Sequence, residues 1–501
     1  MKIFKTRIYI FSFLILFAGG IAALAMRYTG GALFPDDAFT AADTVQDKSK
    51  SEEEMFGGDE TVTPSEKIKN DAISGTIEKK SVTFNGYLNS RTSVNVKRSS
   101  ILRDIKVIDS NNFLSYFQSD FELDARLLKG IRGYFNISAD YYPAGIPKSR
   151  TFQVPLAYLG IPAYFTKVDV MVAEKINAVF SINEVFVDVN FAKSVYFRIG
   201  KQVLKWGVGY LWTPNDLVNV EKKNILDSSQ IREGAYGFKV HVPFGTRANI
   251  YSFIDLNKAR NLSDISMANK VEMLFKKTEM ALSILLKKKN VPVYGYDVTS
   301  RIVGLDIHGE VSLSYGDNNR RLRVYPWYII GANSSILMET MYLVPGKTSI
   351  MDYRVRGTWI PKASFGFGRG FEVKDVKDRI RVDVEAFYNH AGYDRNIFEK
   401  DFLSVGYFLS RGLYTPNYYG KYYAGIFITI RQMFVEELSS MVNCIVNIKD
   451  QSSVISGIIT YAPYYDLTLN LMVNGFIGKE NREYTVYGNY LMTEFSVKLV
   501  F

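Results

Sequence analysis

The sequence predicts an all-β protein whose strands close into one antiparallel transmembrane β-barrel. Short segments alternate polar with apolar residues, and after residue 25 no stretch is apolar over the roughly 18 positions that a spanning helix needs. The chain also ends on an alternating segment, which can pair with the first strand and leave no free edge. We expect about 16 strands, within a range of about 14 to 18, because single-chain barrels have even strand numbers.

Residues 1–25 have the pattern of a signal peptide. Lys2, Lys5 and Arg7 precede the apolar residues 8–16, and the Ala-Leu-Ala sequence at 23–25 supplies small residues for cleavage. An uncleaved membrane anchor is the alternative, because the apolar stretch is nearly long enough to cross a bilayer.

Residues 26–80 are predicted to form a flexible, disordered, acidic periplasmic tail, because a stretch so poor in aromatic residues cannot bury enough apolar surface to fold. The barrel is then expected to span residues 81–501. The formal net charge of the whole chain is +10, and its acidic part lies within 36–80, so the barrel itself is basic. Basic loops or a basic lumen would attract anions, phosphorylated glycolipid or acidic sugars, although surface solubility explains the charge equally well.

The alternation of residue types is the main argument for strands. From Arg379 to Glu385 every second residue is charged, and the residues at even positions from Ile380 to Tyr388 are apolar. In an extended chain these two sets lie on opposite faces, one suited to water and one to hydrocarbon. Other segments with this pattern are 185–191, 195–199, 351–359, 424–431, 442–448 and 467–474. A soluble β-sandwich would alternate as well, with its apolar face packed inward.

The last strand carries a more specific signal. Phe495, Val497, Leu499 and Phe501 occupy alternate positions and end the chain on an aromatic residue. This terminus resembles that of bacterial outer-membrane β-barrels, whose assembly machinery recognises such a closing strand. The resemblance implies an outer-membrane location, with membrane lipid and the barrel-assembly machinery as partners.

A second resemblance lies between Arg198 and Asp216. The residues that carry it are Gly200, Lys201, Gln202, Trp206, Gly207, Gly209, Pro214 and Asp216. This segment resembles the strand and loop of porin-like barrels of the alginate-export and carbohydrate-porin type. The two glycines of the Trp-Gly-x-Gly turn and the proline predict a tight rim loop or an inward-folded one. We expect Trp206 and Trp212 to anchor the rim in the headgroup layer, or else to stack on a sugar.

Arginine and lysine residues on the polar faces are the candidate solute-selecting groups. They are Arg198, Lys201, Arg321, Arg323, Arg354, Arg356, Arg379 and Arg381. Fixed positive charges in a narrow aqueous pore select anions. Since acidic residues stand among them, internal salt-bridge ladders that brace the wall are an equally good interpretation.

No catalytic motif is recognisable around the three histidines, His241, His308 and His390, and we expect neither enzymatic activity nor a cofactor or metal site. The leading hypothesis is an outer-membrane porin or substrate-selective channel for small anionic or sugar-like solutes, without nucleic-acid binding and with possible homo-oligomerisation. The alternatives are a structural or adhesive surface protein that binds through a long loop at 142–162, and an outer-membrane hydrolase that uses a histidine.

Overall fold

We analysed a computed structural model of the chain. The structure describes residues 81–97, 113–128, 130–154, 168–191, 194–204, 206–216, 218, 234–257, 259–261, 264–287, 290–319, 321–326, 340–344, 348–394, 396, 398, 414–486 and 488–501. The segments predicted as signal peptide and acidic tail lie outside these residues. No helix among the described residues is both long and apolar enough to cross a membrane.

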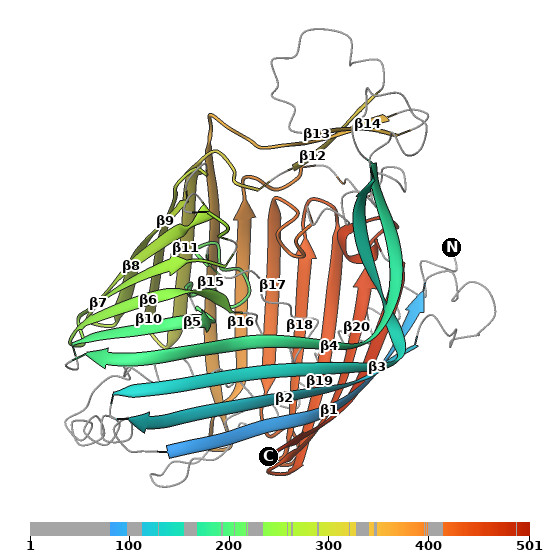
Figure 1. Cartoon of the computed structure of the whole chain (residues 1–501). Helices are drawn as coiled ribbons and strands as arrows, with labels where there is room; N and C mark the ends of the chain where they lie inside the picture. Colours follow the sequence, from blue (N-terminus) through green and yellow to red (C-terminus); the bar gives the residue numbers. More distant parts are fainter. Residues whose placement is uncertain are drawn as a thin grey trace.

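The described chain consists almost entirely of strands (Figure 1). The first eleven are β1 (Ser81–Lys97), β2 (Phe113–Leu128), β3 (Ile131–Val154), β4 (Val168–Phe191), β5 (Val195–Gln202), β6 (Ala235–Phe244), β7 (Ala248–Asp255), β8 (Ser266–Phe275), β9 (Thr278–Lys287), β10 (Val293–Ile302) and β11 (Leu305–Tyr315). Three short strands follow: β12 (Arg321–Pro326), β13 (Thr340–Val344) and β14 (Thr348–Tyr353). The remaining elements are β15 (Trp359–Val373), β16 (Val376–Asn389), β17 (Tyr422–Ile430), β18 (Leu438–Asn447), β19 (Ser452–Tyr464), β20 (Leu467–Ile477), the 3-10 helix η5 (Glu483–Thr485) and β21 (Asn489–Val500).

Eighteen of these strands form one closed antiparallel barrel. Each strand pairs with its neighbours in the chain, and β21 closes the sheet by pairing with β1, from Tyr87↔Val500 to Lys97↔Asn489. The predicted fold class is confirmed, and the strand number lies at the upper end of the expected range, two above the expected sixteen. In β6, β7 and β8, inward positions such as Ala235, Phe253 and Ala268 are apolar, so the alternation that indicates strands is weaker there.

The two ends of the barrel differ in the lengths of their connections. At one end, β2–β3, β8–β9, β10–β11 and β15–β16 are joined by two residues each. The C-terminus lies at this end as well. Phe501 bonds to Gly86 near the start of β1, and the start of β1 pairs with the end of β2, next to the short β2–β3 turn. The opposite end carries the long connections 203–234, 316–358 and 390–421. Short turns face the periplasm in outer-membrane barrels, so the long connections are extracellular.

The wall is apolar outside and polar inside. In β16 the odd-numbered residues from Arg379 to Asn389 face the lumen, whereas Ile380, Val382 and Val384 face outward. Likewise Leu471 and Val473 of β20 are exposed on the outside, while Asn474 is buried inside. Cys444 lies on the apolar side of β18, with Val442 and Val446. This arrangement suits lipid outside and water inside, as in a transmembrane β-barrel of the outer-membrane type.

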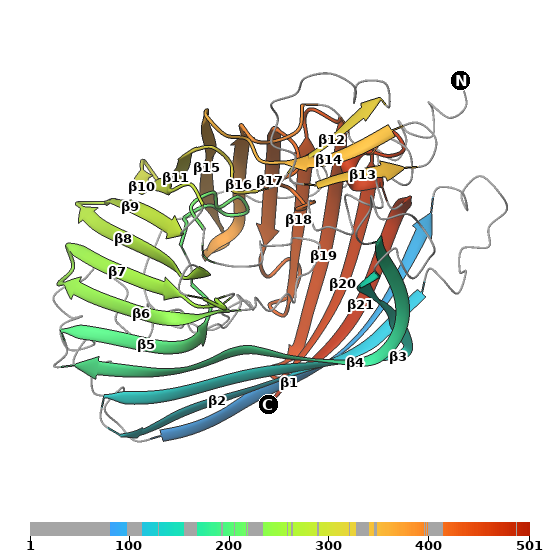
Figure 2. The same cartoon turned by 45° about the horizontal axis from the view of Figure 1, so that its top comes forward.

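Residues 351–359 do not form the single strand that the sequence predicts. β14 ends at Tyr353 and β15 begins at Trp359, because Gly357 adopts a left-handed φ of 74° and turns the chain between them. The intervening backbone bonds to a turn instead, with Gly316 N donating to Thr358 O and Asp317 N to Val355 O. β14 joins β12 and β13 in a separate sheet at the extracellular end (Figures 1 and 2).

The 142–162 segment is also not a plain loop, since residues 142–154 belong to β3. β3 and β4 pair with each other as far as Val154↔Val168, whereas β2 follows β3 only to Tyr141. A two-stranded ribbon therefore extends past the wall (Figure 2). The register shifts between Tyr141 and Ile146, and this irregularity accommodates Pro143.

Candidate functional site

The connection after β5 folds into the barrel. Its described residues 203–204 and 206–216, here called the inner loop, follow Gln202 and contact β10, β11, β16 and β17 on other parts of the wall. Of the two predictions for this segment, the inward-folded loop is the observed one. The loop therefore crosses the interior of the barrel.

Glu310 of β11 holds two parts of the inner loop, around Gly209 and at Asn215. Its Oε1 accepts hydrogen bonds from the backbone N–H of Val208 and of Gly209, the latter at 2.6 Å, and its Oε2 accepts one from Asn215 N at 3.1 Å. The close approach requires glycine at 207, where a Cβ would lie 2.9 Å from Glu310 Oε1 and φ is +144°. A carboxylate that accepts several backbone N–H bonds is a strong anchor, because charge-assisted bonds are stronger than neutral ones.

Glu385 of β16 holds the part of the inner loop that lies between these two. Its Oε2 accepts hydrogen bonds from the backbone N–H of Leu211 at 2.7 Å and of Trp212 at 3.4 Å. A Cβ at Gly209 would lie 2.8 Å from Glu385 Oε1, so the second glycine of the motif also allows close contact with a carboxylate. Both anchoring residues lie on the lumen face and are almost completely buried.

The tryptophans predicted at the rim are buried inside the barrel. Trp212 is fully buried, stacks on Phe387 with ring centroids 5.9 Å apart, and donates from Nε1 to Asn417 O at 2.8 Å. Trp206 packs with Leu204 and Phe253. The rim prediction is wrong because the loop turns inward, where these rings exclude water from the contact with the wall. Pro214 and Asp216 are buried in the same loop.

The inner loop also touches the extracellular connection 390–421. Thr213 N donates to the hydroxyl of Tyr418 at 3.0 Å, in addition to the bond from Trp212 to Asn417. Tyr210 packs against Phe427 of β17 with ring centroids 4.5 Å apart, and burial raises the pKa of Tyr210 to about 12. The loop is thus fixed both to the wall and to the extracellular mouth.

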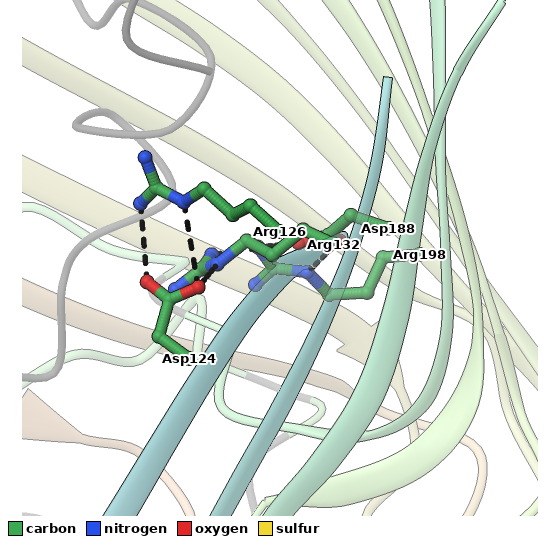
Figure 3. Close-up of polar contacts among 5 residues, drawn as sticks. All are labelled: Asp124, Arg126, Arg132, Asp188 and Arg198. Atoms are coloured by element: carbon green, nitrogen blue, oxygen red, sulfur yellow. Dashed lines mark hydrogen bonds and ion pairs between the residues drawn. The ribbon is translucent and has the colours of Figure 1, made fainter. Parts of the chain in front are cut away.

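A ladder of alternating charges crosses β2 to β5 on the lumen face (Figure 3). Arg132 Nε bonds to Asp124 at 2.9 Å and its Nη1 lies 3.5 Å from Asp188, which in turn accepts Arg198 Nε at 2.6 Å. Arg126 adds an ion pair to Asp124 at 3.1 Å. The guanidinium of Arg198 also lies over the ring of Phe186 at 3.9 Å. The ladder ties four successive strands together.

Two of the predicted solute-selecting arginines are therefore in ion pairs. Arg198 pairs with Asp188, and Arg381 pairs with Asp383 at 2.7 Å and with Asp306 at 3.0 Å. Arg379, also on the lumen face, donates to the carbonyl oxygens of Gln432 at 2.6 Å and of Val373 at 3.4 Å. These contacts favour the bracing interpretation for Arg198 and Arg381.

Five other predicted selecting residues do not lie on the lumen face of the wall. Lys201 shares the outward side of β5 with Ile199 and donates to Ile182 O at 2.6 Å, because the residues facing inward are Arg198, Gly200 and Gln202. Arg321 and Arg323 belong to β12 in the separate sheet, where Arg321 lies over the ring of Tyr393 at 5.7 Å. Arg354 and Arg356 lie in the connection between β14 and β15.

The C-terminal residues form the closing seam. The backbone of Phe501 exchanges hydrogen bonds of 2.9 and 3.0 Å with Gly86, and its ring lies near Phe84 and Phe121. Phe495 and Leu499 face outward. On the lumen side of the seam, Arg91 of β1 bonds to Glu494 of β21 at 2.6 Å. The role of these residues as an assembly signal stays a prediction.

The histidines contact an amide, a carboxylate and a phenol. His241 Nε2 lies 3.1 Å from Asn249 Oδ1, His308 Nε2 lies 3.6 Å from Glu385 Oε1, and His390 Nδ1 lies 2.8 Å from Tyr388 OH. Among the described residues, no group of three or more His, Cys, Asp or Glu is arranged to hold a metal ion.

Glu310 and Glu385 are the residues that sequence reasoning missed. The alternation places both glutamates on the polar face of a strand. It does not show that they bind the inner loop, which lies about a hundred or more residues earlier in the chain. The only local signal is the pair of glycines in the Trp-Gly-x-Gly turn, which indicates close backbone contact without naming what approaches.

Comparison of the sequence with family models and with curated proteins finds no match. Comparison with solved structures matches OccAB4 of Acinetobacter baumannii at 8% sequence identity, with a TM-score of 0.47, over 85% of this chain and 99% of that one. It also matches OpdL of Pseudomonas aeruginosa at 7% identity, with a TM-score of 0.47, over 84% and 98% of the two chains. OccK9 of Pseudomonas aeruginosa matches at 8% identity, with a TM-score of 0.46, over 85% and 98%.

Proposed function

We propose that the protein is an outer-membrane channel for small anionic or sugar-like solutes, with the inner loop as its constriction. The observation that carries this proposal is the fixation of the loop across the lumen by Glu310 and Glu385. A barrel of eighteen strands is wide enough for an aqueous passage, so a loop fixed across it sets the size of the solute that passes.

The wall around the loop supplies groups that suit such solutes. The ladder of Arg132, Asp188 and Arg198 keeps the lumen face of β3 to β5 polar, which suits a hydrophilic solute. Arg379 bonds to neutral carbonyl oxygens and keeps its positive charge on the lumen face, which favours anions. The basic composition of the barrel acts in the same direction.

Conductance of the purified protein in planar bilayers tests the proposal. We expect discrete open-channel steps, with a reversal potential in a salt gradient that indicates anion preference. Replacement of Glu310 and Glu385 together by Gln should raise the conductance several-fold, because both residues lose their charge and an amide NH₂ at residue 310 must face a backbone N–H group of the loop.

Glu279→Gln is the matched control, because Glu279 is a lumen-side carboxylate of β9 near a periplasmic turn, away from the inner loop. Its conductance should equal that of the wild type. A wild-type protein that inserts into the bilayer without any conductance steps would exclude a channel. A double variant with unchanged conductance would show that the inner loop is not the constriction.

A further inference from the structure

Glu483 of η5 is a buried carboxylate at the extracellular mouth. Its Oε1 accepts from Asn417 N at 3.0 Å and lies 3.5 Å from Tyr414 OH. Its Oε2 accepts from Tyr423 OH at 2.8 Å and from Asn447 Nδ2 at 2.7 Å. Only 2% of the residue is exposed. Four donors from three other parts of the chain therefore converge on one carboxyl group.

These contacts join three extracellular connections. Glu483 lies between β20 and β21, Asn417 lies between β16 and β17, and Asp450 lies between β18 and β19. Asp450 Oδ2 accepts from Glu483 N at 2.8 Å, and Asp450 Oδ1 accepts from the backbone N–H and the hydroxyl of Ser452. We call Glu483, Asn417, Asp450, Tyr423 and Asn447 the mouth cluster.

Asn417 connects the mouth cluster to the inner loop directly. Its N–H donates to Glu483, its carbonyl oxygen accepts from Trp212 Nε1 at 2.8 Å, and its Oδ1 accepts from Tyr484 OH at 2.7 Å. Asn417 has a φ of +64°, a left-handed conformation that asparagine tolerates better than most residues. This backbone conformation points the N–H of Asn417 to Glu483 and its C=O to Trp212.

Two acidic groups share this buried place. The titratable or charged groups that face Glu483 are Asp450 from the β18–β19 connection, Tyr423 from β17, Tyr414 from the β16–β17 connection, and its chain neighbours Tyr484 and Arg482. Burial, and then the nearby Asp450, raise the pKa of Glu483 to about 7, although the bonds from Asn447, Tyr423 and Asn417 favour its ionised form.

We propose that Glu483 is a latch that holds the inner loop closed through Asn417 and releases it when its charge changes. The inference rests on the inner loop being the constriction of a channel. Neutral Glu483 keeps its bonds, because the hydroxyls of Tyr423 and Tyr414 can turn from donor to acceptor. Ionised Glu483 beside Asp450 places two negative charges in a buried site, which favours opening of the cluster to water.

The sign of the pH dependence follows from linkage. When the cluster opens, the pKa of Glu483 falls from about 7 toward the ordinary value of 4.5, so the closed cluster binds the proton more tightly. Closure is therefore most favoured at acid pH and weakens as the pH rises from about 4.5 to about 7. For a carboxyl that becomes fully hydrated, the ratio of open to closed molecules rises at most about 300-fold.

A spin label on the inner loop tests the latch without relying on conductance. In a Cys444→Ser background, a nitroxide on Val208→Cys reports loop mobility in the full-length protein, because Val208 contacts Glu310 through its backbone. We expect mobility to increase from pH 5.5 to 8.5 in the parent protein and to stay low in Glu483→Gln, whose amide cannot ionise. The matched control, Glu480→Gln, changes an exposed carboxyl of the same connection and should keep the response.

Asp450→Asn is the second variant. It removes the like charge, so the midpoint of the mobility change should move to lower pH. The latch is excluded if mobility in the parent is independent of pH, or if Glu483→Gln responds as the parent does. If the mobility of the label depends on pH but the protein shows no conductance steps, the channel is excluded and the latch is supported. If the protein shows conductance steps but the mobility of the label does not depend on pH, the latch is excluded and the channel is supported.

Discussion

Among single residues, the buried charged side chains of the lumen face form consecutive ion pairs. Asp188 accepts bonds from both Arg198 and Arg132, and Phe186 lies against the Arg198 guanidinium. A buried ion pair contributes little net stability compared with an apolar pair, but loss of one partner leaves a charge without compensation. The stability of β2 to β5 therefore depends on the buried members of the ladder, which have no other compensation for their charge.

We predict that Arg198→Ala lowers the free energy of unfolding by about 3 kcal/mol, because Asp188 keeps only its longer contact with Arg132. Urea unfolding in detergent measures the effect. Arg126→Ala is the comparison: Arg126 is more exposed and leaves the Asp124–Arg132 pair intact, so about 1 kcal/mol or less is expected. Equal losses in the two variants would contradict a ladder that braces the wall.

Among the strands, β15 carries phenylalanines on the face toward lipid and glycines on the face toward the lumen. Phe365, Phe367 and Phe371 face outward, while Gly366 and Gly368 face inward. A Cβ on Gly366 would lie 2.4 Å from His308 Nε2, and one on Gly368 would lie 2.0 Å from Asp383 Oδ1. The glycines leave room for the longer side chains of β11 and β16, which meet across them.

Gly368→Ala should displace Asp383 and its partner Arg381, because neither has space to coexist with a methyl group at that position. We expect a shifted reversal potential in a salt gradient with the barrel still folded. Gly457→Ala in β19 is a suitable control, since no atom lies within 4 Å of the added Cβ. Identical reversal potentials for both variants and the parent would indicate that the Arg381–Asp383 pair does not influence the permeating ion.

The inner loop is held in place by residues of the barrel wall. Its backbone N–H groups bond to carboxylates of β11 and β16, and its tryptophans pack on β6 to β8 and β16 to β17. Because buried backbone N–H groups need partners, a loop inside a barrel depends on the wall to supply them. This dependence explains why the loop and the two glutamates form one unit.

For the molecule as a whole, the last residue lies at the seam where the barrel closes. Phe501 exchanges two backbone hydrogen bonds with Gly86, and a Cβ on Gly86 would lie 2.8 Å from the Phe501 ring. The ring therefore covers a glycine at the seam, next to Phe84 and Phe121.

Deletion of Phe501 should slow folding of the purified chain into lipid bilayers and lower the folded fraction, because both seam bonds and the ring contacts are lost. Conversion of the heat-modifiable band on gels measures both quantities. Phe501→Tyr retains the backbone and the ring and should fold as the parent does. If the deleted chain folds at the parental rate and yield, the terminal residue has no part in closure.

Much of this architecture is predictable from local pattern. Alternation with period two places Arg379, Arg381, Asp383 and Glu385 inward and predicts the outward face of β20. Each of these predictions needs only the sequence of one strand, because one face of the strand meets lipid and the other meets the lumen. The prediction fails where a second layer covers the inner face, as at Ala235 and Phe253, or where a single glycine breaks a strand, as at Gly357.

The local residue pattern is enough to predict that this chain crosses a membrane with strands and pairs its final segment with the first, because facing lipid or water is a property of each residue in turn. The folded structure was needed to show that Trp212 is buried in the lumen, that Arg198 is paired, and that Glu310, Glu385 and Glu483 hold the loops. Those positions depend on bonds between residues far apart in the chain, whose partners are brought together by closure of the barrel and not by any local pattern.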